Sequence, residues 1–499
     1  MLPDIETLRA SAKRLKKAFA AGDIEAARRL QAVIPNLSQP KHADFLHVIA
    51  RENLHESWSK LKFAVEASRL SRAQRADRLA QALYFGQRWV VRKLLEEDPT
   101  LVSERFDLQL ATYNFDAVRE RITQAPSSAT EPVAGRSPIV HLAFSRYIHM
   151  APSKRTQMLQ IAALLVEHCA DVNDGYPPEA GSSHRLSALY GALGHANNLP
   201  LAEWLLEHGA HPDDGESLYH SNELGHHDGL RLLMRFGVST SGTNAIARAL
   251  DFNDVVALRL LLEYGADPNE AVEAHPSGQP VESAPVLHHA ACRWCSAEIV
   301  GLLLDFGADP SPIWQGHTAY AMARIYGNAP MARVLEERGQ APSLTPTEEI
   351  LAACAEGRTP ARLDPADLIL EDRRLLTSLV WGPVHLEHIK ALVVAGLDPN
   401  ETNEMGLTAL HVACWEGLPE RAAYLLELDP DLSHRNAFGG DALDTTIHGS
   451  EFCPKASERD HVACAQLLLD AGVIFNRSWI GHFGNEEMAS FFDGRIADD

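Results

Sequence analysis

The stretch "LLEYGADPNE" (Leu261–Glu270) decides the fold, because close variants of it return along most of the 499-residue chain. The variants are "LLVEHCADVND" ending at Asp174, "LLEHGAHPDD" ending at Asp214, "LLDFGADPS" ending at Ser311, "LVVAGLDPNE" ending at Glu401 and, more loosely, "LLLDAGVIFN" ending at Asn476. A phrase that returns roughly every thirty residues predicts a solenoid of stacked repeats. Such arrays typically bind partners on an extended concave surface.

Each copy of the phrase predicts the end of a helix. Leucines at helical spacing lead to a glycine just past the last turn, where glycine adopts the left-handed cap without steric cost. An Asp-Pro or Asp-Val then starts a turn. The predicted capping glycines are Gly209, Gly237, Gly265, Gly307, Gly339, Gly396 and Gly472. They are unevenly spaced, so we expect trimmed loops in some repeats and insertions in others, such as a surface loop over 271–285 that is open to proteolysis.

A shorter helix is predicted ahead of each of these endings. Its start reads "GLTALHVACWEG" (Gly406–Gly417), "APVLHHAACRW" (Ala284–Trp294) or "GHTAYAMARIYG" (Gly316–Gly327). Together these residues resemble the ankyrin repeat, whose first helix begins T-P-L-H-x-A-A and whose second ends L-L-x-x-G-A-D-x-N. The resemblance implies an all-α solenoid of ankyrin-like repeats, each with two antiparallel helices and a hairpin-like loop. It also implies that His288 and His411 are structural histidines that bond neighbouring loops.

The chain is expected to have three regions. Residues 1–70 form a helical N-terminal region or cap, residues 71–345 hold ankyrin-like repeats of which the first are degenerate, and residues 346–499 hold a degenerate repeat, C-terminal repeats and a cap. Residues 1–78 carry 15 Lys and Arg against 9 Asp and Glu, so a basic docking arm is the alternative to a cap. Phe45, Trp58 and Leu61 favour the cap, because they need a core. This beginning also resembles a leader of some bacterial ankyrin-repeat proteins, which implies an architecture and no particular activity.

Composition limits the partners. The formal net charge of −22 disfavours nucleic acid and anionic membranes. The sequence has no apolar run of the roughly eighteen residues that a transmembrane helix needs, and its beginning lacks a secretory signal. Seven scattered cysteines suit a reducing compartment, so we expect a cytoplasmic protein.

No familiar catalytic motif is present, so an enzymatic activity is not indicated, and neither a cofactor nor a metal is expected. Cys292 and Cys295 form a lone C-x-x-C beside two histidines. A structural zinc site usually needs a second pair of ligands from elsewhere in the chain. Two small buried thiols are therefore the favoured interpretation.

Alignment of the short helices brings polar residues into columns. The position after the structural histidine holds His141, Gly191, His220, Arg248 and His289 in five consecutive repeats, with Tyr190 and Tyr219 just before two of them. One turn further, where the family faces its groove, lie Arg146, His195, Glu223, Asp251 and Arg293. Gly191 has no side chain, so it could open a pocket between its neighbours. Three interpretations stay open: a hydrogen-bond ladder between repeats, a ligand pocket or peptide-contact patch, and a metal site.

A second candidate cluster, Trp415, Glu416 and His448, lies on the late repeats. Trp415 is either an interface anchor or packed against Phe438. The most favoured function is binding of a protein or peptide along the concave groove. The alternative is an enzyme or a receptor for a polar small ligand, with a pocket built around Gly191 from His, Tyr, Glu and Arg side chains of the central repeats.

Overall fold

The computed structural model describes residues 3–35, 37, 40, 42–103, 105–179, 181–276, 283–358, 361–475, 485, 487–489 and 491–492. These residues are mostly helical, which confirms the predicted all-α repeat fold. The chain divides into two compact units. One comprises residues 70–323 and 328–342, and the other comprises residues 1–69, 324–327 and 343–499.

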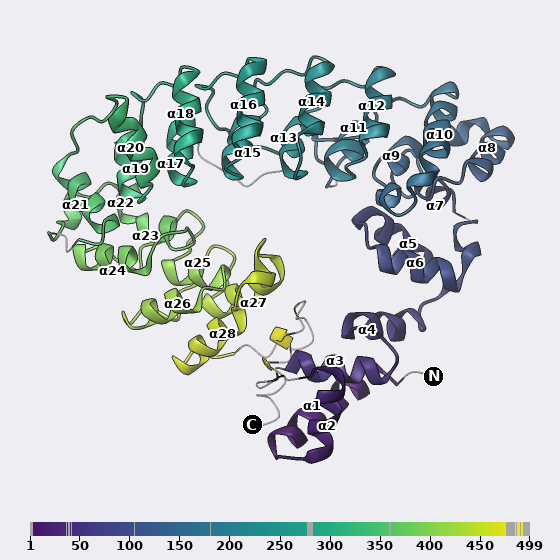
Figure 1. Cartoon of the computed structure of the whole chain (residues 1–499), viewed down its shortest axis with the longest axis horizontal. Coiled ribbons are helices and arrows are strands. Elements are labelled where there is room, and N and C mark those ends of the chain that lie inside the picture. Colours follow the sequence, from purple (N-terminus) through teal and green to yellow (C-terminus); the bar gives the residue numbers. More distant parts are fainter. Residues whose placement is uncertain are drawn as a thin grey trace. The chain divides into compact units, whose positions relative to one another are not determined.

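Helix pairs build the first of these units. The pairs are α5 (Arg72–Phe85) with α6 (Arg88–Glu97), α7 (Phe106–Ala111) with α8 (Phe115–Gln124), α9 (Pro138–Ala143) with α10 (Arg155–Glu167), α11 (Ala188–Tyr190) with α12 (Leu199–Glu207), α13 (Ser217–His220) with α14 (Asp228–Arg235), α15 (Ala245–Asp251) with α16 (Val255–Tyr264), α17 (Val286–Cys292) with α18 (Ala297–Asp305), and α19 (Ala319–Ile325) with α20 (Ala329–Glu337). In Figure 1 the short helices α11, α13, α15 and α17 form an inner row, and their partners α12, α14, α16 and α18 form an outer row.

Two inner helices and two loops depart from this regular pattern. The helix α11 continues into a π-helical turn over Gly191–His195, and α13 continues into a 3-10 turn over Ser221–Glu223. Two antiparallel hairpins lie between repeats: β1 (Gly175–Tyr176) pairs with β2 (Leu186–Ser187), and β3 (Ile313–Trp314) pairs with β4 (His317–Thr318). Further 3-10 turns cover Pro99–Val102, Pro126–Ala129, Arg146–His149, Pro152–Lys154, Pro365–Asp367 and Ala456–Glu458.

The recurring phrase closes helices as predicted. All seven capping glycines have a positive φ, for example 107° at Gly265 and 116° at Gly396. Cys169 takes the same place in its own copy of the phrase, with a φ of 70°, although a side chain disfavours this conformation.

The asparagine of the phrase links successive repeats. The side chain of Asn269 donates to the carbonyl of Gly307 at 3.0 Å and accepts from the backbone N–H of Asp309 at 2.7 Å. Asn173 makes the same two contacts with Gly209 and His211, at 3.2 and 2.8 Å. The phrase therefore both ends one repeat and fixes the next.

The other unit holds the late repeats and the N-terminal helices. Its helices are α1 (Ile5–Ala20), α2 (Ile24–Val33), α3 (His42–Glu52), α4 (Trp58–Ala67), α21 (Pro346–Ala355), α22 (Leu370–Arg373), α23 (Leu375–Leu379), α24 (Leu386–Ala395), α25 (Ala409–Trp415), α26 (Pro419–Leu426), α27 (Ala442–Phe452) and α28 (His461–Asp470). Phe45, Trp58 and Leu61 are buried in a core that α1 to α4 form among themselves. The need for a core is thus met locally, and the choice between a cap and a docking arm stays a prediction.

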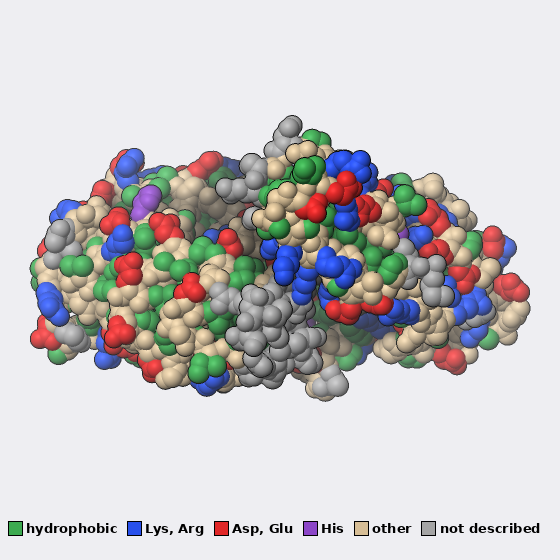
Figure 2. Space-filling model, turned by 90° about the horizontal axis from the view of Figure 1, so that it is seen from below, with side chains coloured by type: hydrophobic (Ala, Val, Ile, Leu, Met, Phe, Trp, Pro, Cys, Tyr) green, Lys and Arg blue, Asp and Glu red, His purple; other side chains and the backbone are tan. Residues whose placement is uncertain are grey.

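The surface carries charges of both signs. The face shown in Figure 2 has Lys and Arg intermixed with Asp and Glu, with hydrophobic side chains scattered between them. None of the helices in the described ranges combines the length and the apolar character that are needed to cross a bilayer.

Candidate functional site

The polar residues predicted on the central repeats form a continuous row of ion pairs. Three of the inner helices each present two of them on one face: His220 and Glu223 from α13 and its following turn, Arg248 and Asp251 from α15, and His289 and Arg293 from the end of α17. The two residues of each helix are three or four positions apart, which places them side by side. We refer to these six residues together with Glu216 as the ion-pair row.

Glu223 and Asp251 link neighbouring repeats. Arg248 donates from Nε and Nη2 to Glu223 Oε1 at 2.9 and 2.7 Å, and from Nη1 to Asp251 Oδ2 at 3.1 Å. Asp251 Oδ1 also lies 2.9 Å from His289 Nε2 and 2.8 Å from Arg293 Nε. Burial alone would raise the pKa of each carboxyl, but hydrogen bonds to the neighbouring histidine and the arginine charges hold the pKa of both below the usual value.

The buried end of the row is Glu216, which the sequence did not single out. Its side chain is 0% exposed, and its two carboxylate oxygens lie 2.7 Å from His184 Nε2 and 3.0 Å from His220 Nε2. The other ring nitrogen of His220 lies 3.0 Å from Glu223 Oε1. Glu216 precedes His220 by four residues, so the helical spacing was the signal that could have revealed it. His184 comes from the irregular loop between β1 and β2, where the repeat gives no register.

His220 is held in its charged form. Burial on its own would lower the pKa of His220, but hydrogen bonds to Glu216 and Glu223 outweigh it and raise the pKa to about 9. At neutral pH the side chain is therefore an imidazolium between two carboxylates. Such a group supports a fixed charge pattern and is poorly suited to accept a proton.

Part of the insertion 271–285 packs over this row. The ring of His275 stacks on Tyr219 with centroids 4.0 Å apart, its Nε2 donates to the Gly215 carbonyl at 2.9 Å, and its centroid is 6.0 Å from that of His220. Val272 and Ala284 pair with each other and are buried. The expected surface loop is therefore only partly correct: Glu273 and Ser283 are exposed, but His275 is buried against the central repeats. Residues 277–282 lie outside the described part.

The pocket expected at Gly191 is absent from this position, because Phe144 fills it. A Cβ on Gly191 would lie 2.3 Å from the Phe144 ring. That ring lies edge-on to Tyr190, whose centroid is 5.9 Å away and whose own ring is 5.0 Å from His220. The glycine thus admits an aromatic ring from the preceding repeat instead of a ligand.

His195 belongs to the same aromatic cluster and reaches the first repeat. Its Nε2 donates to the Tyr84 carbonyl at 2.9 Å, and its ring centroid lies 4.2 Å from Tyr84 and 5.2 Å from Phe144. Burial and the charge of Arg146 lower the pKa of His195 to about 4. His195 is therefore neutral, in contrast to His220, and the predicted set splits into a charged group and an aromatic group.

His141 and Arg146 lie on the aromatic side of this division. His141 Nε2 donates to the Val133 carbonyl at 2.7 Å, and burial lowers the pKa of its ring. The side chain of Arg146 packs near Gly86, where a Cβ would meet it at 3.0 Å. Neither residue contacts the ion-pair row through a hydrogen bond among the described residues.

Trp415, Glu416 and His448 form a smaller cluster in the other unit. The rings of Trp415 and His448 have centroids 5.3 Å apart, and the Trp415 carbonyl accepts from His461 Nε2 at 2.9 Å. Glu416 lies near the Cys453 thiol, at 3.8 Å. Phe438 is 79% exposed, which disfavours the alternative that Trp415 packs against it.

The two histidines beside Cys292 and Cys295 are engaged elsewhere. His288 Nε2 donates to the His317 carbonyl of the next hairpin at 3.0 Å, which is the loop-bonding role expected of it, and His289 binds Asp251. Burial raises the pKa of Cys295 to about 12. In the described part of the chain no three His, Cys, Asp or Glu side chains gather in a way that could hold a metal ion.

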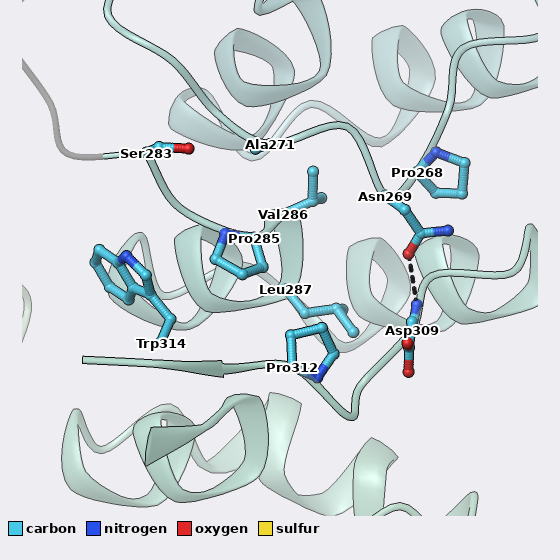
Figure 3. A pocket seen from close by; sticks show the side chains of 10 residues that line it. All are labelled: Pro268, Asn269, Ala271, Ser283, Pro285, Val286, Leu287, Asp309, Pro312 and Trp314. Atoms are coloured by element: carbon cyan, nitrogen blue, oxygen red, sulfur yellow. Dashed lines mark hydrogen bonds between the residues drawn. The ribbon is translucent and has the colours of Figure 1, made fainter. Parts of the chain in front are cut away.

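Two of the hollows on the unit of residues 70–323 and 328–342 lie beside its β-hairpins. One, of about 480 Å³, lies beside the β3–β4 hairpin and is lined by Pro268, Pro285, Pro312, Trp314 and neighbouring side chains, with the Asn269–Asp309 bond on its far side (Figure 3). The other, of about 530 Å³, is lined by residues of α5, α7 and α9 and of the β1–β2 hairpin, His141 among them. None of the candidate site residues named from the sequence lines the first hollow.

Comparison with known proteins identifies one of the repeats. Residues 405–437, which include the helix start "GLTALHVACWEG", match the model of the ankyrin repeat. Protein phosphatase 1 regulatory subunit 27 from Homo sapiens and the same subunit from Mus musculus are each 42% identical to this chain over 55 residues, which is 11% of this chain and 36% of either relative. The chain therefore spans about a third of the length of these relatives. Ankyrin repeats are in general protein-binding modules, which sets the broad class of function.

Proposed function

We propose that this chain is a repeat scaffold that binds a protein or peptide segment along the inner helices α13, α15 and α17. The observation that carries the proposal is the ion-pair row. Glu223, Arg248, Asp251 and Arg293 keep side-chain exposures between 20% and 34%, and each is held in place by its neighbours. A partner that meets such fixed charges finds a surface that needs little further ordering on binding.

The alternating signs of the row favour a particular kind of partner. Along the exposed part the charges run Glu223, Arg248, Asp251 and Arg293, so both signs are offered within three repeats. Complementary charges across an interface contribute specificity and register more than affinity. We therefore expect a polar segment that itself carries both signs. The net charge of −22 supports a protein partner over nucleic acid or an anionic membrane.

The same contacts make catalysis the weaker proposal. A general base needs a carboxylate or imidazole that is free to accept a proton. Glu216, Glu223 and Asp251 each already contact a cationic side chain, and the pKa of His220 is raised. One observation favours the alternative of a polar small ligand: His275 covers Tyr219 beside His220, as a lid would.

The test uses the full chain as bait in a cell extract of its source. The double variant Glu223→Gln/Arg293→Gln removes two exposed charges of opposite sign and leaves the net charge unchanged. We expect it to lose the proteins that the parent retains. The matched control is Arg259→Gln/Glu298→Gln on the outer helices α16 and α18, a more exposed pair with a contact of 3.8 Å. It should retain them.

Two outcomes separate the proposals. Equal capture by the parent and the row variant would contradict the proposed surface, provided that both melt at the same temperature. A change of capture only on His275→Ala would favour the small-ligand alternative, because His275 covers the row without belonging to it.

A further inference from the structure

The hollow of about 530 Å³ in the first repeats is chemically unlike the ion-pair row. Its walls come from α5, α7, α9, the β1–β2 hairpin and the turn before α9, and they include Tyr84, Phe144 and Tyr176. These three rings belong to one cluster, with centroids of Phe144 lying 5.7 Å from Tyr84 and 5.2 Å from Tyr176. Phe144 is parallel to Tyr84 and edge-on to Tyr176, so the hollow has an aromatic wall on one side.

Arg136 brings a positive charge to this wall. Its guanidinium carbon lies 3.9 Å from the ring centroid of Tyr176, 4.9 Å from Tyr84 and 5.8 Å from Phe144. Aromatic faces hold a guanidinium by its plane and leave its N–H edges available. Among the described residues no carboxylate pairs with Arg136 and no acceptor takes its side-chain hydrogens. The contrast is Arg105 in the same hollow, which is paired with Asp107 and Asp77.

A rigid turn fixes the position of Arg136. Val133 and Arg136 pair across a two-residue turn, with φ of 49° at Ala134 and 80° at Gly135. Positive φ at both central residues is the geometry of a tight hairpin. The Val133 carbonyl accepts from the Arg136 backbone N–H at 3.1 Å and from His141 Nε2 at 2.7 Å. His141 thus anchors the turn that carries the arginine.

A second donor lies beside the guanidinium. The hydroxyls of Tyr84 and Tyr176 are 2.9 Å apart, so one donates to the other and the acceptor keeps a hydrogen of its own. Burial raises the pKa of Tyr176, which keeps it a phenol. The guanidinium and this hydroxyl are both donors, and together they suit an acceptor that carries negative charge.

The carboxylate of Asp107, which lines the hollow, is already engaged. Asp107 is buried, and Arg105 donates to its two oxygens at 3.1 and 2.6 Å. Its negative charge nevertheless lies in the same hollow and disfavours an anion of charge −2. A single negative charge is the better match for Arg136.

We propose that this hollow binds a carboxylate carried on an apolar body, with Arg136 and the Tyr84–Tyr176 pair as donors to the carboxylate and the aromatic wall as the surface for the body. The carboxylate could belong to a free small acid or to a glutamate of a peptide beside an aromatic residue. The proposal does not depend on the ion-pair row, which lies on other helices.

The experiment uses the full chain and two carboxylate probes. The first is 3-phenylpropanoate, with 3-phenylpropanamide as its uncharged counterpart. The second is acetyl-Ala-Glu-Phe-amide, with the corresponding Gln peptide. We expect at least one carboxylate to give saturable binding by calorimetry and ligand-observed NMR, while its amide counterpart does not. Binding of only the free acid or only the peptide identifies the source of the group.

Two arginine variants locate the binding. Arg136→Gln should weaken carboxylate binding about 10- to 100-fold, since it removes a charge-assisted hydrogen bond. Arg119→Gln is the matched control, because Arg119 also lies over an aromatic ring, Phe115 at 5.2 Å, but on the outer helix α8. It should bind as the parent does. Arg136→Lys keeps the charge and should bind with intermediate affinity.

Three results would overturn the proposal. One is the absence of saturable binding by either carboxylate to the parent protein, which no variant is needed to establish. Another is equal affinity in the parent and in a folded Arg136→Gln variant. The last is tighter binding of inorganic phosphate than of both carboxylates, which would show that Asp107 does not set the charge of the ligand.

Discussion

The ion-pair row and the aromatic hollow lie in the same stack of repeats, yet they treat charge in opposite ways. In the row every cation touches a carboxylate, and His220 is charged between two of them. In the hollow Arg136 rests on aromatic rings, and the neighbouring His195 is neutral. An ion-pair network in which every charge has a partner holds the inner helices in place. Hydrogen-bond donors that have no acceptor in the protein are available to bind a ligand. The same kind of repeat can therefore build an ion-pair network or a ligand site. The outcome depends on whether carboxylates or aromatic rings lie beside its arginine.

The largest expected effect on stability is that of removing the Glu216 carboxylate from the ion-pair row. Glu216→Ala removes a fully buried carboxylate from between two histidines. Loss of one partner of a buried ion pair costs about 3–5 kcal/mol of unfolding free energy. Chemical denaturation followed by circular dichroism measures the loss. A cost below about 1 kcal/mol, which is typical of exposed pairs, would mean that the row is not a buried network.

The packing of the aromatic cluster can be tested at Gly191. Gly191→Ala places a methyl group against the buried ring of Phe144, where the space is 2.3 Å. Overpacking of this kind costs about 1–3 kcal/mol, and we expect the upper part of that range. The matched control is Gly301→Ala in α18, where a Cβ meets nothing within 4 Å. It should instead stabilise the protein by about 0.5–1 kcal/mol, because alanine favours a helix.

Dependence on pH sharpens the comparison, because the two histidines respond in opposite directions. The pKa of His220 is raised from 6.5 to about 9, so its stabilisation is complete below pH 6.5 and is lost as the pH rises through 9. The pKa of His195 is lowered from 6.5 to about 4, so its stabilisation is complete above pH 6.5 and is lost as the pH falls toward 4. Each effect is on the order of 3 kcal/mol.

Titration of the imidazole signals by NMR checks this prediction directly. Two histidines that both titrate near 6.5 would contradict it. In denaturation series at several pH values, His220→Gln should flatten the alkaline side of the stability profile and His195→Gln the acidic side.

The smallest predicted effect concerns the recurring phrase. Cys169 holds a left-handed conformation with a φ of 70° in the place where other copies have glycine. Cys169→Gly should raise the unfolding free energy by about 0.5–1 kcal/mol, because the strain of a left-handed side chain outweighs the added freedom of the unfolded chain. The midpoint of urea unfolding measures it. A lower midpoint would show that the exposed thiol contributes more than its backbone strain costs.

The repeat made much of the fold predictable from sequence. The capping glycines and the helix pairs follow from one phrase and its alignment, and the resemblance to the ankyrin repeat implied the loop-bonding role of His288. The row was largely predictable for the same reason, since Glu223, Arg248 and Asp251 belong to the two aligned columns and meet between adjacent repeats. Glu216 was within reach through its spacing to His220.

The rest depends on contacts that alignment cannot supply. His184 and His275 come from insertions, which have no equivalent position in other repeats. The Phe144 ring fills the space beside Gly191 because of the orientation of that ring, which a sequence alignment cannot give. The cluster around Arg136 joins residues of several repeats, whereas the repeat pattern relates only neighbours.

The hydrogen bond from His195 to the Tyr84 carbonyl, 111 residues earlier, has a mechanical consequence. In a solenoid whose repeats contact only their neighbours, unfolding can begin at any repeat and spread to the next. A bond that skips repeats closes the segment from α5 to the turn after α11 into a loop, so that the ends of this segment cannot separate without breaking it. Under force this segment should rupture in one event, while the helices after it peel away pair by pair.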